Sequence, residues 1–97
     1  MVAKRRPRFR YIVFSVFGEG KFSEAHVLDA LDAALPDVSF RLIEFDGLSG
    51  IVRCFNTDKD AVIAAMNALV EIGQGKTTVR TVGTSGTIRR ARSKYLR

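Results

Sequence analysis

Short runs rich in β-branched and aromatic residues alternate along the chain with longer segments. In these longer segments apolar residues recur every three or four positions, as on one face of a helix. The run over residues 11–17 ends at a Gly-Glu-Gly turn and predicts a strand. Residues 40–46 and 51–56 have the same character and are joined by a short glycine-containing turn, so they predict an antiparallel hairpin. Residues 77–84 predict the last strand.

Two other segments place their apolar residues at helical spacing. Residues 23–35 predict a helix that starts at Ser23 as N-cap and ends at a proline. Residues 57–72 predict a second helix, which the glycine-rich segment after it brings to an end. Each helix has one apolar face, and we expect that face to lie against a sheet.

The predicted order is strand, helix, strand, strand, helix, strand and a further helix. A split βαβ pair of this kind forms an antiparallel four-stranded sheet with two helices on one face. The expected fold class is therefore α+β, with a ferredoxin-like or RNA-recognition-motif-like βαββαβ architecture and an added C-terminal helix. A chain of 97 residues can bury one modest core. We expect residues 11–97 to form a single domain behind a basic arm at residues 1–10.

Alternation along the predicted strands assigns their side chains to the two faces of this sheet. Ile12, Phe14, Val16, Val52 and Cys54 fall on the face that the two helices cover. The other face resembles the open sheet on which RNA-recognition motifs stack bases, because it carries aromatic and basic side chains. These are Tyr11, Phe17, Ile51, Arg53, Phe55 and Arg80. Since exposed apolar patches are usually occupied, coverage by the last helix or by a partner is favoured over base stacking.

The second predicted helix has a wide apolar arc. Ala61, Ala64 and Ala68 extend this arc around the side of the helix, where small side chains permit close approach of a neighbour. That neighbour is either a partner subunit or the C-terminal helix of the same chain. The candidate partner-interface residues are Ala61, Ala64, Ala68, Tyr11, Phe17 and Phe55.

Residues 81–97 predict a strand that passes through a turn of small residues into a basic amphipathic helix. Ser85 and Thr87 are suited to cap this helix. The free backbone N–H groups at a helix start favour a phosphate, and cations follow on the same element. The alternative is a solvated terminal helix whose cations complement its dipole.

Charge is segregated toward the two ends of the chain. The sequence has 16 Lys and Arg against 10 Asp and Glu, a net charge of +6, yet residues 1–10 and 87–97 contain no acid. Basic ends on an acidic body indicate a polyanionic partner, most simply nucleic acid, although the arm alone also fits a solubility tail. The candidate RNA-binding residues are Lys4, Arg5, Arg6, Arg8, Arg10, Arg80, Ser85, Thr87, Arg89, Arg90, Arg92 and Lys94.

Residue types that would supply catalysis are scattered along the chain. The one histidine, His26, and the one cysteine, Cys54, lie on different predicted elements, and no zinc-site spacing is present. Metal-dependent phosphodiester cleavage would need gathered carboxylates. We therefore expect no catalytic residue and no metal or cofactor bound by this chain. A single cysteine favours a reducing, cytoplasmic compartment, and no apolar run is long enough to span a membrane.

Three segments of the chain resemble one known family. They are Arg-Tyr-Ile-Val-Phe at residues 10–14, Gly-Ile-Val-Arg-Cys at residues 50–54, and Thr-Val-Gly-Thr-Ser-Gly-Thr-Ile-Arg-Arg at residues 81–90. Together, and in this order, they are similar to ribonuclease P protein component 2, the small α/β subunit of archaeal ribonuclease P. That subunit is related to a eukaryotic subunit of ribonucleases P and MRP.

The resemblance implies a non-catalytic subunit of an RNA-based enzyme that removes the 5′ leader of precursor tRNA. Chemistry would be carried by the RNA, with Mg²⁺ held through the RNA. The implied partners are ribonuclease P RNA, precursor tRNA and a TIM-barrel-like ribonuclease P protein, with self-association in a two-plus-two assembly. The alternative function is a free-standing ferredoxin-like RNA-binding module associated with the ribosome or with mRNA.

Overall fold

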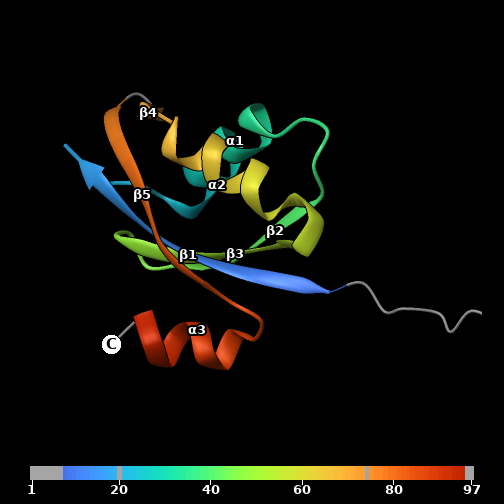
Figure 1. The fold of residues 1–97 in the computed structure, drawn as a ribbon. Coiled ribbons are helices and arrows are strands. Elements are labelled where there is room, and N and C mark those ends of the chain that lie inside the picture. Colours follow the sequence, from blue (N-terminus) through green and yellow to red (C-terminus); the bar gives the residue numbers. More distant parts are fainter. Residues whose placement is uncertain (1–7, 20, 74, 96–97) are drawn as a thin grey trace, which may run out of the picture.

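The computed structural model describes residues 8–19, 21–73 and 75–95, and these form one sheet with helices on both of its faces (Figure 1). The elements are β1 (Phe9–Gly18), α1 (Glu24–Ala34), β2 (Phe40–Phe45), β3 (Ser49–Phe55), the 3-10 turn η1 (Asn56–Asp58), α2 (Lys59–Asn67), β4 (Glu71–Ile72), β5 (Gly75–Ser85) and α3 (Ile88–Tyr95). The strand order is β2-β3-β1-β5-β4, and the described strands pair antiparallel throughout.

The α+β class is confirmed, but the expected four-stranded sheet is wrong, because the sheet has five strands. The predicted helix over residues 57–72 ends at Asn67, and Glu71–Ile72 instead form β4. The Asn67 side chain accepts from the backbone N–H of Thr81 at 3.0 Å, which joins the helix end to β5. Gly73 then turns the chain at a φ of 64°, a left-handed conformation that suits glycine, so the apolar run continues as a hairpin strand.

The predicted boundary between arm and domain is also shifted. β1 begins at Phe9, so Phe9 and Arg10 belong to the sheet rather than to the arm. The backbone N–H of Asn56 donates to the Arg8 carbonyl at 2.8 Å, which continues the pairing with the neighbouring strand. The cations Lys4, Arg5 and Arg6 lie outside the described residues.

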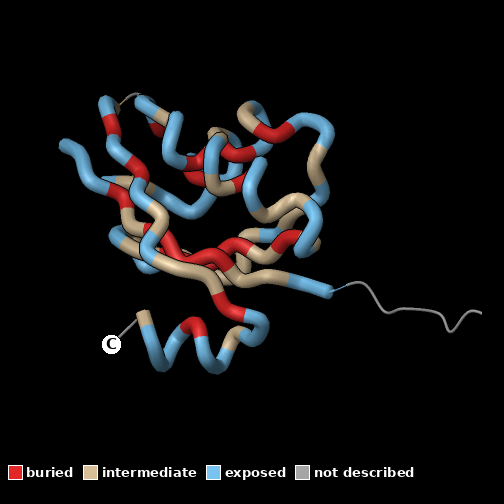
Figure 2. Tube along the Cα trace, in the orientation of Figure 1, coloured by how far each residue is buried: buried red, intermediate tan, exposed pale blue. Residues whose placement is uncertain are grey.

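The main hydrophobic core lies between the sheet and the helices α1 and α2, as Figure 2 shows by the buried positions along β1 and β3. The face assignment is confirmed, since all five expected residues belong to this core: Ile12, Phe14, Val16, Val52 and Cys54. Ser23 caps α1 as predicted, because its Oγ accepts from the His26 N–H at 3.1 Å. Burial raises the pKa of the Cys54 thiol to about 11, as expected of an inert core cysteine.

A second, smaller cluster lies on the opposite face of the sheet, under α3. Val13, Ile51 and Ala91 are its fully buried members, and Tyr11, Ile43, Ile88 and Tyr95 pack around them. Figure 1 shows α3 lying across this face, on the side away from α1 and α2. The prediction that this face is covered is therefore confirmed, and the cover is the last helix of the same chain.

A register shift in the β2–β3 hairpin places the neighbouring residues Ile43 and Glu44 on the side of the sheet that α3 covers. Leu42 pairs with Val52 and Glu44 pairs with Ile51, so Ile43 is an extra residue in β2. A bulge of this kind turns side chains that would otherwise alternate. As a result Ile43 packs into the cluster under α3, and Glu44 reaches the helix beside it.

Candidate RNA-binding surface

The position of α3 is set by a close approach between its last turn and β5. Gly83 lies opposite Val13 in the register of β5 and β1, and the Tyr95 ring occupies the space that a side chain at Gly83 would fill. One turn earlier on the helix, Arg92 Nε donates to Glu44 Oε1 of β2 at 2.7 Å, and the two side chains form an ion pair. The helix is thus held against the sheet by contacts to both β5 and β2.

A basic pocket of about 440 Å³ opens beside α3, and its lining comes from both ends of the described chain. Its residues are Arg10, Thr84, Ser85, Gly86, Arg90, Ser93 and Lys94. Arg10 comes from β1, whereas Arg90 and Lys94 lie four positions apart on α3, so they share one side of the helix. The pocket, hereafter the basic pocket, gathers three cations, and no acidic residue is among its described lining residues.

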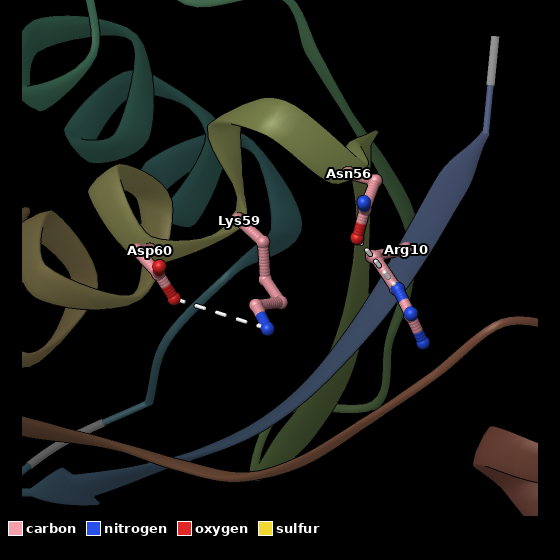
Figure 3. Close-up of polar contacts among 4 residues, drawn as sticks. All are labelled: Arg10, Asn56, Lys59 and Asp60. Atoms are coloured by element: carbon pink, nitrogen blue, oxygen red, sulfur yellow. Dashed lines mark hydrogen bonds and ion pairs between the residues drawn. The ribbon is translucent and has the colours of Figure 1, made fainter.

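Arg10 is held in place by a residue that the sequence did not single out. Figure 3 shows the Arg10 side chain reaching from β1 to Asn56, whose Oδ1 accepts from Arg10 Nε at 2.8 Å. One guanidinium edge is thereby fixed, and its terminal N–H groups stay available to an anion. The nearby pair of Lys59 and Asp60, also drawn in Figure 3, is long at 3.9 Å and exposed, so it contributes little to stability.

The hydroxyls of Ser85 and Thr87 are engaged within the turn that leads into α3. Thr87 Oγ1 accepts from the Arg90 N–H at 3.2 Å, which confirms Thr87 as a helix cap. Ser85 is buried, and its Oγ accepts from the Thr87 N–H at 3.3 Å. Ser85 therefore lines the basic pocket while Thr87 caps the helix beside it, and the cations around the pocket are the groups that can bind a ligand.

The other predicted RNA-binding cations that the structure describes lie outside the basic pocket. Arg8, Arg80 and Arg89 are exposed, and Arg80 pairs opposite Ser15 on the face that α3 partly covers. Arg92 differs from the prediction in that its charge is paired with Glu44 in this structure. Among the predicted cations that the structure describes, Arg10, Arg90 and Lys94 line one pocket, whereas Arg8, Arg80, Arg89 and Arg92 do not line it.

The predicted partner-interface residues fall into two groups. Ala61, Ala64 and Ala68 are exposed along α2, and α3 lies on the opposite face of the sheet, so the C-terminal helix of the same chain does not cover them. On the other face, Tyr11 is half-buried beneath α3 and Phe17 is 56% exposed at the far end of β1. Phe55 instead stacks on Phe9, an arrangement that the sequence analysis missed because Phe9 was placed in the arm.

Carboxylates do not gather in the part of the chain that the structure describes, where no group of three or more His, Cys, Asp or Glu could hold a metal ion. Glu44 is ion-paired with α3. Asp46 Oδ1 accepts from the backbone N–H groups of Ser49 at 2.8 Å and Leu48 at 2.9 Å, which lowers the pKa of this carboxyl and closes the β2–β3 turn. These two acids have structural partners.

None of the helices in the described segments has the length and apolar character needed to cross a bilayer.

Comparison with known proteins agrees with this architecture. The family model described as Rpp14/Pop5 matches residues 10–96. Ribonuclease P protein component 2 of Archaeoglobus fulgidus is 35% identical over 99 residues, covering 94% of this chain and 91% of that protein. The protein of the same name from Thermococcus kodakarensis is 34% identical over 102 residues, covering 94% and 85%.

A solved structure shares the fold. One chain in a cryo-EM structure of yeast ribonuclease MRP superposes with a TM-score of 0.71 at 16% identity, covering 88% of this chain and 79% of that one. The family match extends over nearly all of the described residues and includes the basic pocket. This chain belongs to the Rpp14/Pop5 family.

Proposed function

We propose that this protein is a non-catalytic subunit of ribonuclease P that binds and supports the catalytic RNA in removing the 5′ leader of precursor tRNA. Family membership supports the subunit role, since relatives of similar length carry the name ribonuclease P protein component 2. In this proposal the RNA carries the chemistry and holds the Mg²⁺. The protein acts in the cytoplasm and binds no cofactor of its own.

The observation that carries the RNA-binding role is the basic pocket. Arg10 and Arg90 are far apart in sequence, yet they line one pocket together with Lys94. Three like charges held together repel one another unless an anion compensates them. Phosphates of an RNA backbone provide such anions at regular spacing, and neutralising them releases counterions and favours binding.

The partner surfaces belong to the same proposal. The exposed small side chains of Ala61, Ala64 and Ala68 offer a flat strip along α2 that a TIM-barrel-like ribonuclease P protein or a second copy of this chain can approach closely. Phe17 is an exposed ring at the end of β1 and suits the same kind of contact. Both surfaces lie away from the residues that line the basic pocket, so protein and RNA can bind together.

The second candidate function is a free-standing RNA-binding module. The exposed stack of Phe9 on Phe55 favours it, because solitary modules bind short single strands through such rings. Affinity purification of the full chain from its source cells, with sequencing of the bound RNA, separates the two functions. One large structured RNA recovered with a barrel-fold protein supports the ribonuclease P role, whereas many unrelated short sequences would support the module.

Reversing two charges of the basic pocket is expected to weaken RNA binding. The change is Arg90→Glu with Lys94→Glu, and the RNA is the one recovered with the protein. Each lost phosphate contact should lower the slope of log K against log salt by about one, so the double variant should lose about two. Binding is measured by filter retention across a salt series.

The matched control reverses Lys21, which precedes α1, and Lys59, which begins α2; neither residue lines the basic pocket. It changes the net charge by the same amount and should keep the wild-type salt slope. Equal losses in the two double variants would show that overall charge, and not the basic pocket, determines binding. Circular dichroism checks that both variants remain folded.

A further inference from the structure

An aromatic and basic cluster lies at one end of the sheet face that α3 covers. The Phe9 and Phe55 rings are stacked with centroids 5.2 Å apart and planes inclined by 21°. The Arg53 guanidinium lies 4.4 Å from the centroid of the Phe9 ring. Arg41 pairs directly with Arg53 across β2 and β3, so its side chain projects from the same face. These four residues are named the aromatic–arginine cluster.

The charges of this cluster are not compensated within the described part of the chain. Arg41 and Arg53 are direct cross-strand neighbours, a position in which like charges are destabilising. The described salt bridges join other residues, Arg92 with Glu44 and Lys59 with Asp60. A pair of facing arginines therefore indicates an anionic ligand.

The rings are also partly open to solvent. Phe9 is 36% exposed, and Phe55 is only partly buried. The cluster under α3 reaches as far as Tyr11, which is opposite Arg53 in the β1–β3 register. It does not include Phe9 and Phe55, the next cross-strand pair on this face of the sheet. The last helix thus covers the middle of the sheet face and leaves this end uncovered.

We propose that the aromatic–arginine cluster binds an unpaired nucleobase of an RNA, with Arg41 and Arg53 contacting the phosphates on either side of it. A base can stack on an aromatic ring or on a guanidinium plane, and both kinds of surface are present here. The proposal deepens the proposed function, on which it rests. The basic pocket would bind the phosphate backbone of the RNA, and this cluster would favour single-stranded segments of it. Phe9 and Arg10 are adjacent on β1, so one strand segment contributes to both sites.

The test compares two probes with the same phosphates, an oligouridine of about ten nucleotides and an abasic strand of the same length. Wild-type full-length protein is expected to bind the oligouridine about tenfold more tightly, as one stacked base would provide. Phe9→Leu with Phe55→Leu keeps the apolar volume but removes the rings, so it should abolish this preference while leaving the affinity for the abasic strand unchanged. Fluorescence anisotropy at low salt measures all four affinities.

Two further variants identify the cause of any change. Phe9→Trp keeps an aromatic surface and should retain the preference, whereas Leu48→Ala removes an exposed apolar side chain elsewhere, 70% exposed, and should have no effect. Arg90→Glu with Lys94→Glu should weaken both probes equally and leave the preference intact.

Equal binding of the two probes by wild type, or a preference that survives the loss of both rings, would overturn the stacking proposal and leave the basic pocket as the RNA site. Failure of wild type to bind either probe would also overturn the stacking proposal, whereas the RNA-binding role itself stands or falls with the filter-retention assay on the recovered RNA.

Discussion

Gly83→Ala is expected to dislodge the last turn of α3 from the sheet. A Cβ at this position would overlap the Tyr95 ring, so the ring must leave its place over β5. Overpacking of this kind costs about 1–3 kcal/mol. The main core lies on the other face of the sheet, so the rest of the fold should persist.

Hydrogen exchange provides the measurement for this variant. Amides of residues 92–95 should exchange faster, while those of β1 and β3 keep their protection. RNA affinity should fall as well, because Arg90 and Lys94 are positioned by the same helix. Thermal unfolding should show a lowered midpoint.

Two comparisons separate the packing clash from other consequences of losing a glycine. Gly86→Ala lies in the same segment, has open space around it, and should leave both stability and exchange unchanged. In a Tyr95→Ala background the ring is absent, so Gly83→Ala should then cost almost nothing. A full cost of Gly83→Ala in that background would contradict this explanation.

In reconstituted ribonuclease P, adding this protein with the proposed barrel-fold protein is expected to raise leader cleavage at low Mg²⁺ by about tenfold, the equivalent of roughly 1.4 kcal/mol. Cations of the basic pocket would partly replace Mg²⁺ in neutralising RNA phosphates, so the gain should shrink as Mg²⁺ rises. A leader-cleavage assay across a Mg²⁺ series measures it. The isolated protein is expected to cleave nothing.

Carboxylate substitutions test whether the protein takes part in the chemistry. Asp29→Asn and Asp32→Asn change exposed residues of α1 and should leave cleavage unchanged. Glu44→Gln and Asp46→Asn weaken contacts that hold α3 and the hairpin turn, so they should lower the stability of the protein, and neither should change what the isolated protein cleaves, which is expected to be nothing. Cleavage by the isolated chain, abolished by any of these four changes, would refute the non-catalytic role.

Local pattern determined most of the architecture. Alternating apolar residues in β1 and β3 assign Phe14 and Val52 to the helix-covered face, because side chains on a strand point to opposite faces in turn. Ser23 marks the start of α1 for an equally local reason, since its hydroxyl bonds an N–H three residues later. The basic composition of the two chain ends likewise contains all three cations that line the basic pocket.

Residues 68–72 show where local pattern failed. Their apolar character fits a helix as well as a strand, because propensity differences are small. The choice depends on Asn67, which bonds to β5, and on the pairing of β4 with that strand. Both contacts are made with β5, which comes later in the sequence. The spacing of apolar residues alone therefore could not predict where the helix ends.

Only the tertiary structure decided which cations act together. Arg10 joins Arg90 and Lys94 because β1 pairs with β5 and the chain then folds α3 back over the sheet. A one-residue bulge in β2 places Glu44 within reach of Arg92, so these two side chains form an ion pair. Phe9 stacks on Phe55 because the register of β1 with β3 sets the two residues opposite each other. The sequence by itself determined four of the five strands, most of the helices, the two faces and the basic character of the chain. Which charges and rings meet depended on strand register and on the packing of Tyr95 over Gly83, since both are set by contacts between distant segments.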